Sequence, residues 1–365
     1  MKIIVTGTRG IPNILGGVET HCEELYPLIA TMGHNVTIIR RSCYVTPNNN
    51  IDNYKNVKIK DIYAPRKKSL EAIIHTFLAV LYAKYIKADI IHIHAIGPSI
   101  MVPFARILGL KVVMTHHGPD YDRQKWGKLA KYILKLGEKW GIKYANEVIV
   151  ISDVINQIII DKYHRQDAHL IFNGVNIPTK TQTINYLQFL NLEPQKYILA
   201  MGRFVEEKGF DLLINAFSKL NQSEYKLVIA GDADHQTEYS INLKRLAKDK
   251  NIILTGFIKG DKLNEIFSHA SLFILPSYHE GLPITLLEAM SYNLDVLVSD
   301  IPANRLPELN STDFFLSGSQ EELSKKIELK LKNINFYREY NLSSYQWENI
   351  AKQTNYVYKK IFHNI

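Results

Sequence analysis

The sequence predicts an α/β fold with two doubly wound domains, each a parallel sheet covered by helices. The first observation is length, because 365 residues are enough for two cores of ordinary size. The second is the alternation of short β-branched runs with helical stretches, which is typical of parallel sheets. The chain is 46% hydrophobic and 22% charged, and no apolar run reaches membrane-spanning length. Its two cysteines, Cys22 and Cys43, argue against a disulfide framework and favour a reducing cytoplasm.

The first domain is predicted over residues 1–178. Lys2–Gly7 should form its first strand, followed by a glycine-rich loop and a helix over about 18–32 that Pro27 bends or interrupts. An apolar helix is expected at Leu70–Ile86. The other strands of this half are expected at Asn35–Arg40, Ile90–His94, Lys111–Thr115 and Glu147–Ile151, with a last strand and exit loop in residues 169–177.

The second domain is predicted over residues 179–340. Residues 178–195 carry two prolines without clear periodicity, which makes them the best candidate for a linker. Strands are then expected at Tyr197–Phe204, Lys226–Ala230, Ile252–Thr255, Leu272–Leu275 and Asp295–Val298, with helices between them. Residues 341–365 form a final helix-like segment. Ligands of such sheets bind beyond the carboxyl ends of the strands.

Positive charge is concentrated in the first half of the chain. Residues 1–180 hold 24 Lys and Arg against 14 Asp and Glu, whereas the remainder holds 20 against 22. Such asymmetry suggests an anionic partner, either nucleic acid or a lipid surface. Because neither an aromatic-basic string nor a helix-turn-helix pattern occurs, no nucleic-acid partner is expected.

Two segments of the basic half could contact a membrane. Residues 65–68 place three cationic side chains before the helix Leu70–Ile86, and Arg123–Lys143 mixes six lysines with Trp126 and Trp140. One interpretation is a pair of helices with one packed side and one solvated face. The other is a peripheral contact, with lysines at anionic headgroups and tryptophans at the interface. The sequence leaves both open.

The segment His279–Leu297 is the most informative part of the chain. Glu280 and Glu288 flank a Gly-Leu-Pro turn that opens a short helix, whose first amides are free donors at a positive dipole end. Glu288 should lie about 7–8 Å along the helix axis, at ~1.5 Å per residue, so the two carboxylates are too far apart for the ~5 Å pair of a retaining hydrolase. This spacing suits two clamps on one long ligand with an anionic centre, such as a nucleotide-diphosphate sugar.

A second charged loop, GRFVEEKG, follows the first strand of the second half. Arg203 and Lys208 come after a glycine turn and could converge on one diphosphate, with charge-assisted bonds of about 1.5–3 kcal/mol each. Two exposed surface cations are the alternative. The presence of EGLPITLLE downstream favours the diphosphate interpretation.

Histidines and aspartates offer weaker signals. Adjacent strand residues point to opposite sides, so only one of His116 and His117 can face a ligand, and His117, next to Gly118, is favoured. His92 and His94 share a strand face but are too few for a zinc site. An Asp-x-Asp pair, Asp232 and Asp234, could hold a divalent ion beside a diphosphate, yet a loop turn is the favoured interpretation, so no metal is expected. Asn173 either forms a plain turn or bonds a ligand with its amide.

Five motifs in order, TRGIP with GGVET, THHG, FNG, GRFVEEKG and EGLPITLLE, resemble the retaining glycosyltransferases of family 4. The N-terminal motif is similar to that of bacterial rhamnosyltransferase-like enzymes of surface-polysaccharide synthesis. The resemblance implies the GT-B fold, with two Rossmann-like domains facing a cleft and a C-terminal helix crossing back to the first domain. It further implies sugar transfer from a nucleotide donor with retention of configuration.

The resemblance also implies roles for individual residues. Arg203 and Lys208 would hold the donor phosphates, Glu280 the sugar hydroxyls, Glu288 the ribose, and His117 would lie at the transferred sugar. The predicted catalytic residues are therefore His117, Glu280, Arg203 and Lys208. The predicted donor-binding residues are Gly16, Gly17, Asn173, Gly202, Arg203, Lys208, Glu280, Gly281, Leu282, Pro283, Ile284 and Glu288.

No cofactor is expected beyond the substrate, a UDP-sugar or dTDP-sugar carrying a hexose or deoxyhexose. The expected acceptor is a lipid-linked or free oligosaccharide, and the expected location is the cytoplasm, peripheral at the inner face of the membrane. Two other functions stay open: a sugar-nucleotide epimerase of similar architecture and a non-catalytic scaffold at a membrane surface. A full charged set at the donor motifs argues against the scaffold.

Overall fold

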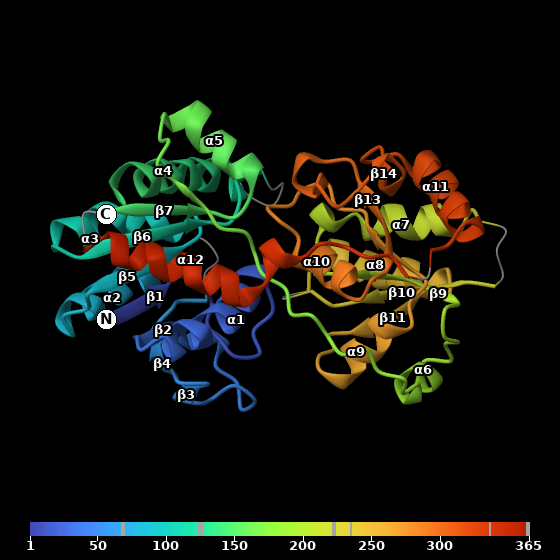
Figure 1. Ribbon diagram of the computed structural model, residues 1–365, viewed down its shortest axis with the longest axis horizontal. Coiled ribbons are helices and arrows are strands. Elements are labelled where there is room, and N and C mark those ends of the chain that lie inside the picture. Colours follow the sequence, from blue (N-terminus) through green and yellow to red (C-terminus); the bar gives the residue numbers. More distant parts are fainter. Residues whose placement is uncertain (67–69, 123–126, 221–223, 234–235, 336, 363–365) are drawn as a thin grey trace. The chain divides into compact units, whose positions relative to one another are not determined.

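The computed structural model describes residues 1–66, 70–122, 127–220, 224–233, 236–335 and 337–362. The chain divides into two compact units, Met1–Gly174 with Ser344–Ile365, and Val175–Ser343. Each unit contains a parallel sheet with helices around it, which confirms the predicted fold class (Figure 1). The end of the chain thus belongs to the first unit, and that unit's first segment ends at Gly174, shortly before the predicted boundary.

The first unit is built on a sheet with the strand order β3-β4-β2-β1-β5-β6-β7-β8, parallel throughout except for the β3–β4 pair. Its strands are β1 (Lys2–Thr6), β2 (Asn35–Arg41), β3 (Asn53–Tyr54), β4 (Val57–Ile62), β5 (Ile90–His94), β6 (Lys111–His116), β7 (Glu147–Val150) and β8 (His169–Leu170). The strands expected for this half are present, although residues 169–177 supply only the short β8. The strands β3 and β4 were not predicted.

Six α-helices of the described residues belong to the first unit. They are α1 (Gly17–Thr31), α2 (Glu71–Tyr85), α3 (Val102–Ile107), α4 (Lys128–Tyr144), α5 (Asp153–Tyr163) and α12 (Trp347–Lys360). Of the two expected effects of Pro27, a bend or an interruption, the interruption is wrong, because α1 is continuous through this buried residue. Its neighbours Tyr26 and Ile29 are buried in the core, and this packing holds the helix where proline removes one hydrogen bond.

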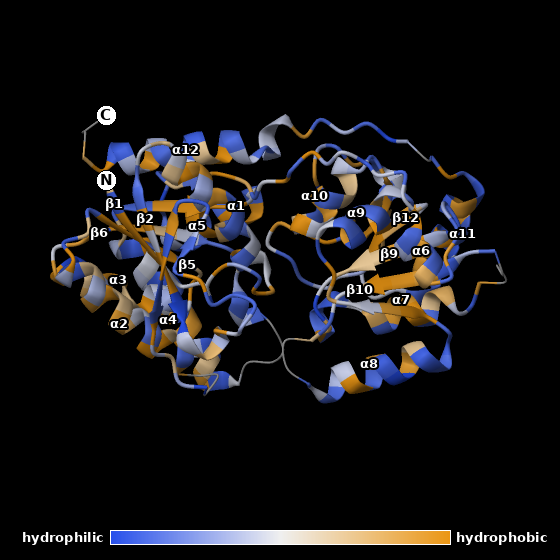
Figure 2. Cartoon of the chain, turned by 90° about the horizontal axis from the view of Figure 1, so that it is seen from below, coloured by the Kyte–Doolittle hydropathy of each residue, from blue (hydrophilic) through white to orange (hydrophobic). Residues whose placement is uncertain are grey.

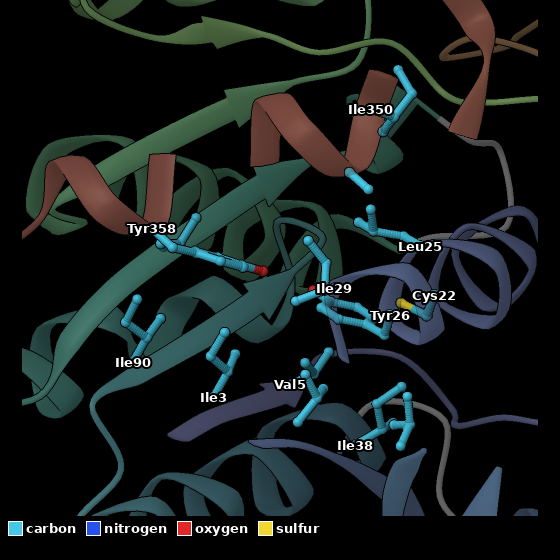
Figure 3. Close-up of a cluster of buried hydrophobic side chains, with 14 of the residues drawn as sticks. Ile3, Val5, Cys22, Leu25, Tyr26, Ile29, Ile38, Ile90, Ile350 and Tyr358 are labelled. Atoms are coloured by element: carbon cyan, nitrogen blue, oxygen red, sulfur yellow. The ribbon is translucent and has the colours of Figure 1, made fainter. Parts of the chain in front are cut away.

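The core of the first unit lies between its sheet and two helices from opposite ends of the chain. Figure 3 shows Leu25 and Tyr26 of α1 close to Ile350 and Tyr358 of α12, above Ile3, Val5, Ile38 and Ile90 of the strands. Trp347 of α12 joins the same cluster and is only 2% exposed. The last helix is therefore part of the first unit's core.

The second unit has an all-parallel sheet with the strand order β11-β10-β9-β12-β13-β14. Its strands are β9 (Tyr197–Met201), β10 (Lys226–Ala230), β11 (Ile253–Gly256), β12 (Leu272–Leu275), β13 (Asp295–Ser299) and β14 (Phe314–Phe315). Its helices are α6 (Asn185–Phe189), α7 (Phe210–Phe217), α8 (Glu238–Asp249), α9 (Asp261–Ser268), α10 (Ile284–Ser291) and α11 (Gln320–Lys332). Figure 2 shows the hydropathy pattern, with hydrophobic strands such as β9 and β10 and a helix α8 that carries both hydrophilic and hydrophobic residues.

The segment expected to be a linker is packed structure of the second unit. It contains α6, whose Leu187 is fully buried. The amide of Leu187 donates a hydrogen bond of 2.8 Å to Glu265 Oε1, and the hydroxyl of Thr183 donates to Glu265 Oε2. None of the helices in the described ranges is long and apolar enough to cross a membrane.

Candidate functional site

An ion pair joins the two charged motifs of the second unit. Lys208 ends a short 3-10 turn, Glu206–Lys208, in the loop after β9. Its Nζ lies 2.5 Å from Oε1 of Glu280, and the two side chains are only 16% and 11% exposed. The loops are also tied by a backbone hydrogen bond of 2.8 Å from Tyr278 N–H to Glu207 O. Residues separated by 72 positions in the sequence are thus held as one charged cluster.

Glycines let the GRFVEEKG loop approach its surroundings closely. Gly209 adopts a φ of +61°, and an added Cβ would lie 2.4 Å from the carbonyl oxygen of Pro276. Gly202 donates a backbone hydrogen bond of 3.0 Å to Ala230, and an added Cβ would lie 3.4 Å from Cε of Lys208. Arg203 follows and is partly exposed. The loop therefore places both predicted cations near one small stretch of backbone.

The EGLPITLLE motif presents the amino end of α10. No described side chain caps this helix, and Pro283 occupies the N-cap position, one residue earlier than expected. The amide of Leu286 donates a hydrogen bond to Pro283 O, so the amides of Ile284 and Thr285 are the donors at the end of the helix. Such an end favours an anion. Of the other predicted residues, Leu282 is buried, whereas Gly281 and Glu288 are partly exposed.

Asp232 is engaged within the second unit. Its Oδ1 lies 2.7 Å from Nζ of Lys244, and its carbonyl oxygen accepts a hydrogen bond of 3.1 Å from the amide of Phe204. Asp234, the second member of the Asp-x-Asp pair, lies outside the described residues. The described aspartate thus serves the loop after β10, as the turn interpretation expected.

The first unit opens α1 with the predicted glycine pair. Gly16 has a φ of +142°, and an added Cβ would lie 2.1 Å from Oε2 of Glu19. Gly17 is the first helical residue and is exposed, and an added Cβ there would meet no described atom within 4 Å. Gly16 is therefore required by the local backbone, whereas Gly17 leaves open space at a helix amino end.

Glu19 is a structural partner of this loop that the sequence analysis missed. It is 4% exposed, and its Oε1 accepts hydrogen bonds from the amide of Arg9 at 2.9 Å and the hydroxyl of Thr8 at 3.1 Å. Burial alone would raise the pKa of Glu19, but the charge and amide of Arg9 lower it below the usual value. The ionised carboxylate thereby fixes the loop between β1 and α1.

The two adjacent histidines of THHG point to different surroundings. His116 is fully buried, its Nε2 lies 3.0 Å from Glu138 Oε1, and its Nδ1 accepts a hydrogen bond from the amide of Gly118. His117 is partly exposed, and its Nε2 lies 2.9 Å from Nδ1 of His94. His116 therefore anchors the loop, and His117 is the more exposed of the two histidines.

Glu138 of α4 holds His116 and was also missed from the sequence. The carboxylate is fully buried and takes hydrogen bonds from Tyr121, Lys162 and Tyr163 besides His116. Burial alone would raise its pKa, but the hydrogen bond and charge of His116, followed by the bonds from Lys162 and Tyr163, lower the pKa to about 2. A glutamate in a lysine-rich helix gave no sequence signal for this role.

His117 belongs to a cluster of aromatic rings beneath α1. Its ring centroid lies 5.0 Å from that of His21 and 5.2 Å from that of His94. Burial lowers the pKa of His21 to about 4, and those of His94 and His117 well below the usual value, with neighbouring histidines adding to the effect. Asn173 is buried, and its Oδ1 lies 3.0 Å from His21 Nδ1, so this predicted donor-binding residue supports the cluster in the structure.

Comparisons with known proteins match each half of the chain to a glycosyltransferase family model. A model described as Glycosyltransferase Family 4 matches residues 15–178, and a model described as Glycosyl transferases group 1 matches residues 184–347. An uncharacterized glycosyltransferase of Methanocaldococcus jannaschii is 25% identical over 98% of both chains. A UDP-Gal:α-D-GlcNAc-diphosphoundecaprenol α-1,3-galactosyltransferase of Escherichia coli is 26% identical over 86% of this chain and 84% of its own.

Among solved structures, sucrose-phosphate synthase from Thermosynechococcus elongatus matches with a TM-score of 0.82 at 21% identity, over 99% of both chains. This likeness concerns the fold alone. The family matches do not favour the epimerase or the scaffold. These two family models, each matching a little under half of the chain, support a family-4-like glycosyltransferase of the GT-B fold.

Proposed function

We propose that this glycosyltransferase moves a hexose or deoxyhexose from a UDP-sugar or dTDP-sugar to a lipid-linked or oligosaccharide acceptor, with retention of configuration, in surface-polysaccharide synthesis. The observation that carries the proposal is the Lys208–Glu280 pair in the same unit as the uncapped amino end of α10. The name of the E. coli relative, which includes UDP-galactose and a diphosphoundecaprenol acceptor, supports this donor and acceptor class.

The second unit is proposed to bind the nucleotide and diphosphate. Lys208, Arg203 and the amides of Ile284 and Thr285 would stabilise the charge that grows on the leaving diphosphate. Glu280 would accept hydrogen bonds from sugar hydroxyls while its contact with Lys208 fixes its position. Glu288 would bind the ribose. This division gives each part of one elongated donor a charged or polar partner.

The first unit is proposed to contribute His117 and the Gly16–Gly17 turn. His117 would hydrogen-bond the transferred sugar, with its ring held by His94. The open space at Gly17 would admit the donor to the amino end of α1. The acceptor oxygen would attack from the face that the diphosphate leaves, and the leaving phosphate oxygen would take the acceptor proton.

Removing one partner of the ion pair tests the donor site. We expect Lys208→Ala and Glu280→Gln each to lower kcat/KM by about 10- to 150-fold, as the loss of one charge-assisted bond implies. Lys196→Ala is the matched control, because Lys196 pairs with Glu224 at 3.1 Å on the surface of the same unit. Near wild-type transfer by Lys208→Ala and Glu280→Gln would contradict the assignment of the donor site.

A thermal-shift series tests the donor class. UDP, dTDP, GDP and their sugars are added with and without EDTA, and a donor at 100 times its Kd should stabilise the unit that binds it by about 2.7 kcal/mol. We expect a metal-independent shift with UDP or dTDP and none with GDP. A shift that requires a divalent ion, or that favours GDP, would contradict the proposed donor binding.

Peripheral membrane contact is a second part of the proposal, and exposed apolar side chains support it. Phe77, Leu81 and Tyr85 recur every fourth residue of α2 and are 38%, 40% and 83% exposed. Leu129 and Tyr132 of α4 are 73% and 65% exposed. Lysines of α4 at positions 128, 135, 139 and 143 are exposed, whereas Lys67, Lys68, Lys125 and Trp126 lie outside the described residues. Apolar residues beside lysines match the chemistry of an anionic lipid surface at the cytoplasmic face.

Vesicle cosedimentation tests this surface. The protein should bind vesicles that contain anionic lipid more strongly than neutral ones, and added salt should weaken the binding. Leu129→Ser with Tyr132→Ser should reduce it. Phe189→Ser is the control, because Phe189 is 78% exposed on the second unit. Equal binding to both kinds of vesicle would contradict the electrostatic part of the proposal.

A further inference from the structure

Three histidines that are far apart in the sequence converge in the first unit. His21 comes from α1, His94 ends β5, and His117 follows β6. One ring nitrogen of each can be chosen so that all three lie within 4.8 Å of one another. Two of them, Nδ1 of His94 and Nε2 of His117, are 2.9 Å apart.

We propose that His21, His94 and His117 form a binding site for a transition-metal cation, with Zn²⁺ as its representative. Imidazole nitrogens suit such ions, and three histidines with a fourth open position are a known zinc arrangement. His117 is partly exposed, whereas the other two are buried, so His117 is the ligand that a solvated ion can reach.

Two of the three rings are already oriented by an outer contact. His21 Nδ1 lies 3.0 Å from the amide oxygen of Asn173, which can only accept, so the proton is on Nδ1 and the lone pair is on Nε2. His94 Nε2 lies 2.5 Å from the hydroxyl of Tyr26. This hydroxyl can accept a hydrogen bond from His94 Nε2–H while it donates one to His92 Nδ1 at 2.8 Å. The Asn173 contact thus fixes the tautomer of His21, and the Tyr26 hydroxyl, which can accept, is compatible with the His94 tautomer that leaves Nδ1 for a metal.

His92 provides an internal comparison. Its ring stacks on that of His94 with centroids 4.3 Å apart, yet both of its nitrogens are engaged. Nδ1 contacts the hydroxyls of Tyr26 and Tyr358, and Nε2 contacts the hydroxyl of Thr115. The strand pair His92 and His94 therefore supplies one ligand, and the other two come from α1 and the THHG loop.

Metal binding requires a small and balanced change. A tetrahedral zinc with bonds of 2.0–2.1 Å separates its ligand nitrogens by about 3.4 Å, so His94 and His117 must part slightly and His21 must approach. The hydrogen bond between His94 and His117 is exchanged for two metal–nitrogen bonds. His94 keeps its proton on Nε2, and the proton that His117 Nε2 donates to His94 Nδ1 moves to His117 Nδ1, so Nε2 can bind the metal and no proton is lost.

A bound metal would take His117 away from the sugar, so zinc should inhibit transfer; this consequence rests on the proposed function. The histidine site would then be an inhibitory metal site, distinct from the donor-binding residues of the second unit. Direct metal binding and inhibition are therefore measured separately.

The test uses the full chain stripped with EDTA and a chromophoric chelator as competitor for Zn²⁺. We expect saturable binding of one equivalent by the wild type. Asn173→Ala should weaken binding by about 10–100-fold, as for second contacts in other sites, and His21→Gln or His117→Gln should weaken it further. His164→Asn is the control, because His164 is exposed at the left-handed C-cap of α5 and should leave the affinity unchanged.

A measurement on the wild type guards against variants that misfold. Co²⁺ should give the visible absorption of a four-coordinate site, and Zn²⁺ should abolish it. Absence of that absorption, absence of saturable Zn²⁺ binding, or wild-type affinity in folded His21→Gln and His117→Gln would each overturn the metal site. Metal binding with unchanged transfer would keep the site and overturn the role of His117 in the proposed function.

Discussion

Acid should destabilise the first unit through Glu138 more than through an ordinary carboxylate. Hydrogen bonds from His116, Lys162 and Tyr163 lower the pKa of Glu138 from 4.5 to about 2 in the folded chain. A carboxylate whose folded pKa is depressed contributes stability that is present above the unfolded pKa and is lost as the pH falls through the folded pKa. The stabilisation is therefore complete above about pH 5 and disappears between about pH 4.5 and 2.

The magnitude follows from the difference in pKa. One pKa unit corresponds to about 1.36 kcal/mol, so ionised Glu138 contributes about 3 kcal/mol at neutral pH. No discount for solvent applies, because the side chain is 0% exposed. Roughly 1 kcal/mol of this contribution should be lost by pH 3.5, one pKa unit below the unfolded value. Glu138→Gln keeps the shape of the side chain but removes the titration.

Tryptophan fluorescence isolates the first unit, because all three tryptophans, at positions 126, 140 and 347, belong to it. Urea unfolding is followed by this signal for the wild type and Glu138→Gln between pH 7 and pH 3.5. The difference in unfolding free energy between the two proteins should narrow by roughly 1 kcal/mol as the pH falls. A gap that stays constant over this range would refute the reasoning.

Four further substitutions test local packing and charge. Gly17→Ala should leave the free energy of unfolding unchanged or raise it by up to about 1 kcal/mol, while it lowers sugar transfer. Gly16→Ala should lower the free energy of unfolding of the first unit by about 1–3 kcal/mol, because its Cβ would collide with a carboxylate. Urea titration and initial rates compare the two variants, and a loss of stability in Gly17→Ala would contradict the prediction. Gly174→Ala should cost about 1–3 kcal/mol in the tryptophan transition, because its Cβ would lie 2.3 Å from Trp347 Cδ2, and an unchanged midpoint would show that the contact is absent. Asp313→Asn removes a buried carboxylate that lies between two cations, and it should lower the free energy of unfolding of the second unit by about 3 kcal/mol. Circular dichroism should show this shift, while the transition followed by tryptophan fluorescence stays the same. A shift of both transitions would indicate that the units unfold together.

The buried strands were the most predictable elements. Ile90–His94 and Leu272–Leu275 have the predicted bounds, because strands covered on both faces are continuous β-branched or aliphatic runs. The strand Val57–Ile62 was missed since its lysines alternate with apolar residues and its burial is confined to one face. Residues 178–195 were predicted to be a linker because their own pattern shows no periodicity. In the structure, a hydrogen bond to the distant Glu265 ties the short helix α6 to the second unit.

The candidate site was predictable only where its residues are close in sequence. Periodicity placed His116 and His117 on opposite sides, but the distant Glu138 decides which one is buried. The meeting of His21, His94 and His117 depends on the strand order β1-β5-β6, which no local pattern specifies. The ion pair of Lys208 with Glu280 likewise requires two loops that only the sheet brings together.

The return of the last helix to the first core has a consequence for biosynthesis. During translation, the ribosome would release the whole of Met1–Gly174 and then the second unit before Trp347, Ile350 and Tyr358 could emerge. Until then the surface of α1 that they cover would be open to water and to chaperones. A premature stop codon near residue 343 would therefore leave the first unit without part of its core, whereas the second unit, which is made later, would be spared.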